Sequence, residues 1–214
     1  MAVIETGDFC FGRPLRITSL CVKGDGNIVD AQKESSLSGN IHDKSTAILK
    51  AFINRLVKGY ERISVDFYIS FEQIYGRIDG DSASVAEAVS MISAITGIPI
   101  RQNIAITGSM NQLGEVQAIG AVNEKIEGFF DTCQLFGEIK DKAVLIPESN
   151  AEELVLRDSV EAAVIKGDFN IITMETIDDA IEVLMCTDEY KLHSIYELVA
   201  EELTKYSKRV KEAE

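Results

Sequence analysis

The spacing of apolar residues changes repeatedly along this chain of 214 residues, and these changes constrain its fold more than any other feature. Residues 63–71 alternate aromatic and β-branched side chains with other residues, which is typical of a strand. Residues 85–97 repeat apolar side chains at helical spacing and end at a glycine, which predicts a helix. Beyond Pro99 the pattern becomes strand-like again. Alternation between these two periods predicts a protein that mixes helices and strands.

The rest of the chain carries the same two kinds of pattern. Residues 14–34 contain two strand-like runs around Gly24-Asp25-Gly26, which predicts a hairpin. Residues 43–58 predict a helix with Asp43 as its N-cap. The second half predicts helices at 121–136, from Ser149-Asn150, at 176–185 and from Asp188, and strands at 103–110, 114–119, 143–147 and 169–174.

The order of these elements predicts the domain organisation. No low-complexity linker and no internal repeat divides the chain. The fold class is therefore α+β, with a β-rich N-terminal lobe and an α/β C-terminal lobe. We predict one domain over residues 1–187, followed over 188–214 by an amphipathic helix that packs on this domain or extends it.

Composition argues against several classes of function. The net charge of -14 argues against broad contact with phosphate backbones, so no nucleic acid is expected as a partner. No Gly-rich phosphate loop is present, no apolar run is long enough to cross a bilayer, and the first residues lack the features of a secretory signal. Four widely spaced cysteines are typical of reduced thiols. We therefore expect a cytoplasmic protein without a membrane partner.

Ser82 is the candidate nucleophile, because it lies between an acidic, glycine-containing turn and a predicted helix. Residues of this kind often do no more than cap a helix, and that is the simpler interpretation. In the functional interpretation, Gly80 permits a tight backbone turn, and amides at the helix start stabilise an oxyanion beside the Ser82 hydroxyl. The turn alone leaves both interpretations open.

A nucleophilic serine also needs a base. The chain has only His42 and His193, each interpreted as an ordinary exposed histidine, and their spacing supports no metal site. The remaining candidate is a lysine with a lowered pKa. Lys125 lies among apolar and small residues, unlike most other lysines of the chain. Taken alone, it is better explained as a side chain that extends from an amphipathic helix into solvent.

Three segments together resemble the proteolytic domain of the Lon protease family: GRIDGDSASVAEA, then AITGSMNQLGEVQAIGAVNEKIEGFF, then VLIPESN. The motif G-D-S-A-S is similar to the LonB-like branch of that family, and not to the branch with G-P-S-A-G. The similarity extends from FGRPLRIT to TIDDAIEVLM, which is nearly the whole chain. It implies the Lon proteolytic-domain fold, which resembles a domain of a ribosomal protein.

The resemblance implies a role for each residue that matches a family motif. It implies that Ser82 is the nucleophile and Lys125 the general base of a serine endopeptidase with a Ser-Lys dyad. Thr107 matches the family threonine whose hydroxyl holds the lysine amine. Asp79, Gly80 and Asp81 match the acidic turn before the nucleophile.

The family motif G-G-x-K-E-K is changed in this chain. Asn123 stands at the first lysine position, and the second lysine, which is the catalytic one, is present as Lys125. Gly120-Ala121 stands where two glycines are usual. We expect both changes to be tolerated and the dyad to be intact.

The resemblance also implies partners. Lon proteins join this domain to an AAA+ ATPase that unfolds substrates, and they assemble into six-membered rings. We therefore expect unfolded proteins or peptides as substrates, a homo-hexamer, and a longer protein whose AAA+ module alone binds ATP. No cofactor and no metal are expected in this chain. One alternative is a catalytically silent Lon-like module for ring assembly or substrate binding, and another is an RNA-binding module.

Overall fold

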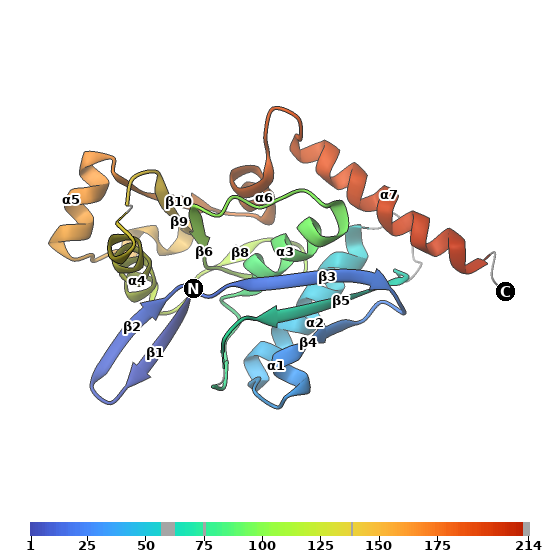
Figure 1. The fold of residues 1–214 in the computed structure, drawn as a ribbon, viewed down its shortest axis with the longest axis horizontal. Helices are drawn as coiled ribbons and strands as arrows, with labels where there is room; N and C mark the ends of the chain where they lie inside the picture. Colours follow the sequence, from blue (N-terminus) through green and yellow to red (C-terminus); the bar gives the residue numbers. More distant parts are fainter. Residues whose placement is uncertain (57–62, 75, 138, 212–214) are drawn as a thin grey trace.

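The computed structural model describes residues 1–56, 63–74, 76–137 and 139–211 of the chain. They form a mixed α/β arrangement (Figure 1). The strands are β1 (Ala2–Thr6), β2 (Phe9–Arg13), β3 (Ile17–Lys23), β4 (Ile28–Asp30), β5 (Val65–Phe71), β6 (Ile104–Ile106), β7 (Ser109–Met110), β8 (Val116–Gln117), β9 (Lys142–Pro147) and β10 (Phe169–Met174). The helices are α1 (Ala31–Glu34), α2 (Asn40–Leu56), α3 (Ser84–Thr96), α4 (Val122–Leu135), the 3-10 helix η1 (Glu148–Glu153), α5 (Asp158–Lys166), α6 (Ile177–Met185) and α7 (Leu192–Lys211).

The first sheet has the order β3-β5-β4, so the strand that comes last in sequence lies in the middle. β5 pairs antiparallel with β3 and parallel with β4. Alternate residues of β5 are buried, in agreement with the period expected from its sequence: Val65, Phe67, Ile69 and Phe71. The most apolar strand of this lobe therefore takes the central position.

The predicted hairpin of residues 14–34 is wrong, because β5 separates β3 from β4. The turn between them wraps around Asp66 of β5. The Asp66 carboxylate accepts the backbone N–H groups of Asp25 at 2.9 Å and Asn27 at 2.7 Å. The Gly24 N–H also donates to the Ser64 carbonyl at 3.0 Å. The prediction of a turn at these residues was correct, but the turn bonds to a strand that is distant in sequence.

The second sheet is parallel, in the order β10-β9-β6. Its central strand β9 is buried on both faces, as parallel strands usually are. Val144 and Ile146 belong to a core shared with α4 and α5, whereas Leu145 points into a second core shared with α3, α6 and α7. The alternation along β9 thus joins the two hydrophobic cores formed by the described residues.

Helix α3 lies between the two sheets and carries Ser82 just ahead of its first turn (Figure 1). It contacts β3, α2, α6 and α7, so apolar residues on several of its faces are fully buried. Three residues of α7, Ile195, Val199 and Leu203, belong to the same core. The start of α3 is therefore fixed by packing from several sides.

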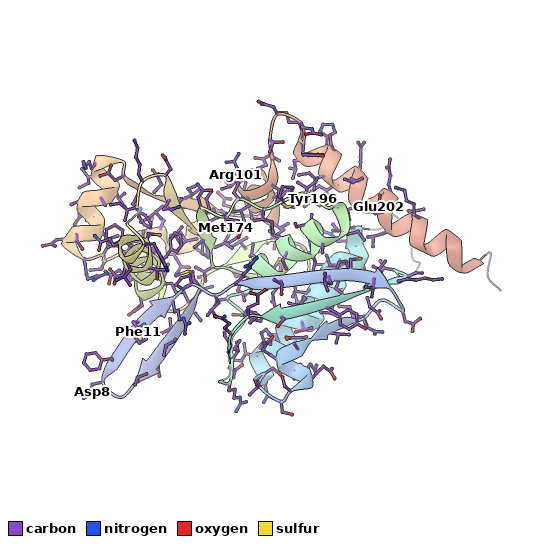
Figure 2. The ribbon with its side chains drawn as sticks, viewed as in Figure 1. Asp8, Phe11, Arg101, Met174, Tyr196 and Glu202 are labelled. Atoms are coloured by element: carbon purple, nitrogen blue, oxygen red, sulfur yellow. The ribbon has the colours of Figure 1, made fainter. Side chains whose placement is uncertain are left out.

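An N-terminal hairpin of β1 and β2 was not anticipated from the sequence. Its two strands pair antiparallel around a turn at Gly7, and β2 packs against α4. The hairpin projects from the body of the protein, with Asp8 at its tip and Phe11 along it (Figure 2). Phe9 is 76% exposed and Phe11 is 48% exposed. Gly7 between two apolar runs was the signal that could have predicted it.

Several predicted helix starts are also corrected. α2 begins at Asn40 and not at Asp43, whose carboxylate instead accepts a hydrogen bond from Ser38 Oγ at 2.8 Å. The predicted end of this helix at 58 lies outside the described residues. α7 begins at Leu192 and not at Asp188.

The segment after β9 differs from its prediction as well. Ser149-Asn150 begins no long helix but lies in η1, and a separate helix, α5, follows. The buried Asn150 side chain accepts from the Ile119 N–H at 3.0 Å and donates to the Ile119 carbonyl at 3.1 Å. Its role is therefore to hold a neighbouring loop. No helix of the described residues is long and apolar enough to cross a membrane.

Candidate active site

Residues 79–82, called here the Ser82 turn, connect the first sheet to α3. Gly80 has a φ of +117°, a conformation that disfavours any residue with a Cβ atom. Asp79 Oδ1 accepts the Gly80 N–H at 2.9 Å, which tightens the turn. The sequence expectation of an unusual backbone at Gly80 is confirmed. Ser82 is partly exposed at the end of this turn.

The backbone of Ser82 is held by the segment that follows β6. The Ser82 carbonyl accepts the Gly108 N–H at 2.8 Å and the Thr107 hydroxyl at 3.3 Å. Thr107 is fully buried. We expected its hydroxyl to hold the Lys125 amine, but its hydrogen bond in the structure supports the Ser82 backbone instead. Its role in catalysis stays a prediction.

Ser84, the other hydroxyl of the motif, does not face the cleft. Its Oγ accepts the Met110 N–H at 3.0 Å and lies 3.5 Å from the Gly108 carbonyl. Ser84 is 1% exposed. This side chain therefore joins α3 to β7, and it is not available to react with a substrate.

Lys125 lies in the first turns of α4, and its amine meets Ser82. Its Nζ is 3.0 Å from Ser82 Oγ, and the residue is only 4% exposed. Val122 and Ile126, its neighbours on α4, are buried in the core against β9, which fixes the helix. The structure thus brings together two residues that lie 43 positions apart in the sequence.

The environment of Lys125 favours the neutral amine. Burial lowers the pKa of Lys125 to about 8, while the charges of Asp81 and Glu124 raise it and only partly offset the burial. A substantial fraction of this lysine is then uncharged in mildly alkaline solution. A neutral amine within hydrogen-bond distance of a hydroxyl can accept its proton. The solvent-extended interpretation of Lys125 is therefore wrong.

The pair opens into a cleft of about 770 Å³. One wall comes from the β1–β2 hairpin, and the other from the Ser82 turn and the start of α4. Leu15, Ile17, Phe71 and Ile78 supply apolar lining. A cleft of this size can hold a short stretch of extended peptide. Asp79 and Asp81 lie at the same cleft, beside the hydroxyl that they precede.

His42 is not the exposed residue that we expected. It is 1% exposed, and its Nε2 lies 2.5 Å from Asp30 Oδ2 and 4.0 Å from Glu87 Oε1. The early start of α2 explains the error, because it places His42 on the same helical face as the buried Leu49 and Phe52. His193, on α7, is exposed as expected.

Comparison with known proteins agrees with this architecture. Residues 12–187 match the family model of the Lon protease (S16) C-terminal proteolytic domain. The chain therefore belongs to this family of proteolytic domains.

Individual relatives point the same way. A Lon protease homolog of Haemophilus influenzae is 39% identical over 94% of this chain and 33% of its own length. A homolog of Escherichia coli is 40% identical over 82% of this chain and 30% of its own length. An archaeal Lon protease of Methanocaldococcus jannaschii is 33% identical over 80% of this chain and 28% of its own length. The chain thus spans about a third of the length of these curated relatives.

Proposed function

We propose that this domain is a serine endopeptidase in which Ser82 is the nucleophile and Lys125 is the general base. The observation that carries the proposal is the distance of 3.0 Å between Lys125 Nζ and Ser82 Oγ, at a buried lysine. Packing alone gives no reason to bury an amine against a hydroxyl, because burial of an ammonium costs free energy. A catalytic role gives that reason.

The reaction follows from this geometry. The neutral Lys125 amine takes the proton of Ser82 Oγ as this oxygen attacks the carbonyl carbon of a peptide. The resulting ammonium returns the proton to the leaving amine, and an acyl-enzyme remains. Water, with its proton taken by the same lysine, then releases the second product and restores the serine.

Charge on the tetrahedral intermediate needs donors near Ser82. Helix α3 begins at Ser84, and the N–H groups of Ser84 and Val85 already donate to the Asp81 and Gly108 carbonyls. The N–H groups of Ser82 and Ala83, just ahead of this helix, are therefore our candidates for stabilising the oxyanion. Gly80 would contribute by setting the direction of the turn that carries them.

The substrates that we propose are unfolded proteins and peptides; the names of the relatives support protein substrates in general. We also propose that the longer protein assembles as a homo-hexamer, that its AAA+ module alone uses ATP, and that it acts in the cytoplasm. Light scattering over a range of concentration and salt tests the assembly. A two-fold dimer that covers Ser82 under all conditions would contradict a ring.

The direct test of the function is hydrolysis of an unstructured protein and of short fluorogenic peptides by the wild type and by Ser82→Ala. We expect Ser82→Ala to be inactive and still folded, because loss of a hydroxyl near a helix start costs only about 1 kcal/mol. A fluorophosphonate reagent should also label Ser82 in the wild type. Equal hydrolysis by both proteins, or labelling at another serine, would refute the proposal.

A further inference from the structure

Three titratable side chains are buried together beside the Ser82 turn, at the junction of β4, α2 and α3. Asp30 ends β4, and His42 and Glu87 lie in the first turns of α2 and α3. Each side chain is at most 2% exposed. The mechanism proposed above uses none of them. Burial of ionisable groups is costly, so this cluster calls for its own explanation.

The imidazole of His42 lies at the centre of the cluster. Its Nε2 is 2.5 Å from Asp30 Oδ2 and 4.0 Å from Glu87 Oε1. The ring also meets Phe71 of β5 edge-on, at 5.6 Å between ring centroids. Asp30 and Glu87 are thus the charged groups that face the ring, while β5 presents only an aromatic side chain.

These contacts favour a charged imidazole. Burial lowers the pKa of His42, but the hydrogen bond to Asp30, the charges of Glu87 and Asp30, and the Gly80 carbonyl raise it, and the net shift is upward. The pKa of Glu87 is raised to about 7. Burial is the main cause, the charge of His42 lowers this pKa, and the charge of Asp30 raises it. The cluster therefore keeps its protons to a higher pH than the free side chains would.

Backbone contacts connect His42 to the Ser82 turn. Asp79 Oδ1 accepts the N–H groups of Ile41 at 3.1 Å and His42 at 3.3 Å, in addition to that of Gly80. Gly39 allows this approach, since a Cβ atom there would lie 2.0 Å from the carboxyl carbon of Asp79. The start of α2 and the Ser82 turn are therefore held together through one carboxylate, that of Asp79.

The second ring nitrogen of His42 also favours a charged ring. Nδ1 forms no hydrogen bond of normal geometry with any described residue, yet the Gly80 carbonyl is close enough to raise the pKa of the ring. An imidazolium donates from both nitrogens, whereas a neutral imidazole donates from only one. A charged ring can donate to Asp30 through Nε2 and still carry a second N–H donor on Nδ1.

We propose that His42 is a positioning residue: its imidazolium, held between Asp30 and Glu87, fixes the Gly80 end of the Ser82 turn and keeps Ser82 aligned with Lys125. This inference rests on the peptidase function proposed above. In this inference the cluster of Asp30, His42 and Glu87 supports the Ser82–Lys125 site but does not touch the reacting atoms. It also explains why a charged group is retained in the core.

The first test does not depend on catalysis. The chain has only two histidines, so the exposed His193 is an internal reference for a proton NMR titration. We expect the His42 ring to titrate above its ordinary value of 6.5, and the Gly80 and Ser82 amide resonances to follow the same midpoint. They should still do so in His193→Gln and not in His42→Gln. The proposal would be overturned if the Gly80 and Ser82 amide resonances did not change with the His42 titration. It would also be overturned if the His42 ring stayed neutral at acidic pH.

The second test is kinetic. His42→Gln should lower kcat roughly ten-fold or more with little change in KM, because a displaced nucleophile impairs reaction and not binding. Glu87→Gln removes one carboxylate, so it should move the His42 midpoint down and lower kcat, relative to the wild type, at pH values between the two midpoints. His193→Gln is the matched control.

The outcomes separate the two proposals. If His42→Gln does not fold, Glu87→Gln and the NMR titration carry the test. Unchanged kcat in Glu87→Gln at every pH would overturn the positioning role. A stoichiometric zinc content of the purified protein would also overturn it, because a metal would replace the imidazolium proton. If Ser82→Ala hydrolyses peptides normally, the peptidase function fails, whereas the titration still decides whether His42 controls the Ser82 turn.

Discussion

Two buried basic side chains lie on either side of the Ser82 turn, and their pKa values shift in opposite directions. Lys125 meets a neutral hydroxyl, and burial lowers its pKa to about 8. His42 meets two carboxylates, which outweigh burial and raise its pKa. The difference shows that burial alone does not decide the charge of a group. The partner supplied within hydrogen-bond distance decides it.

The contrast also separates two tasks. A base must be able to lose its proton near the working pH, so it has to be buried without a strong anionic partner. A positioning group must keep its charge, so it needs such partners. Lys125 and His42 meet these opposite demands at positions on either side of one short turn, and the following substitutions are designed to disturb one without the other.

The largest effect is expected for Lys125→Met. Loss of the general base should lower peptide hydrolysis roughly 10²–10⁴-fold. The same change should raise the free energy of unfolding at pH 7 by up to about 3 kcal/mol, because a pKa of about 8 in place of 10.5 means that burial of the ammonium opposes folding. Turnover and urea unfolding measure the two effects, with the exposed Lys140→Met as control. Loss of both activity and stability would indicate a structural lysine.

The direction in which stability changes with pH follows from the pKa of Lys125 in the folded and in the unfolded protein. Below pH 8 the folded wild type must bury the ammonium, so its free energy of unfolding should increase as the pH rises from about 8 to 10.5. Lys125→Met should lack this increase. A wild-type stability that does not change over this range would contradict the environment that we assign to Lys125.

Glu87 should affect the pH dependence of stability in the opposite sense to Lys125, and Glu87→Gln tests this. The pKa of Glu87 is raised from 4.5 to about 7 in the folded protein, so the wild type should lose stability as the pH rises through this range. The loss amounts to at most about 3 kcal/mol above pH 7, and Glu87→Gln should remove most of it. Unfolding curves at pH 5 and pH 8 measure the difference, with the exposed Glu161→Gln as control. An equal difference between wild type and variant at both pH values would argue against a raised pKa.

Ser84→Ala tests whether the second hydroxyl of the motif belongs to the scaffold. The change leaves the buried Met110 N–H without its acceptor, so we expect a loss of about 1–3 kcal/mol of stability. Hydrolysis by the folded variant should persist. Thermal unfolding and turnover report the two properties. An inactive but fully stable Ser84→Ala would exchange the roles that we give to the two serines.

The smallest effect is expected at Ala121, where the family motif usually has glycine. Ala121 has a φ of +55° at the start of α4, a left-handed conformation that costs an L residue about 1 kcal/mol. Ala121→Gly should therefore stabilise the protein by up to about 1 kcal/mol with no loss of hydrolysis. A destabilised variant would show that the Ala121 methyl group makes contacts that outweigh the strain.

Local patterns predicted the parts of the site that lie in continuous motifs. The period of α3 and α4, the turn at Gly80 and the family motifs indicated Ser82 and Lys125 before the structure brought them together. Such features depend on residues close in sequence, so one chain suffices to detect them. The roles of Thr107, Asp79 and Asp81 stay predictions.

The rest depends on contacts between distant segments. The order β3-β5-β4 arises because Asp66 of a later strand bonds the Gly24-Asp25-Gly26 turn, and no local rule shows this. Asp30, His42 and Glu87 come from three elements with no characteristic spacing. A helix start placed three residues too late was enough to leave His42 outside the predicted core.

The central claim is that neutral Lys125 removes the proton of Ser82, and the pH dependence of kcat/KM tests it most directly. For the wild type we expect kcat/KM to rise with an apparent pKa of about 8, the value for Lys125 in the free enzyme. Lys125→Arg should be inactive at every pH, because arginine keeps its charge and cannot act as a base. A kcat/KM that is constant from pH 6 to 9, or a Lys125→Arg protein with wild-type turnover, would contradict the account.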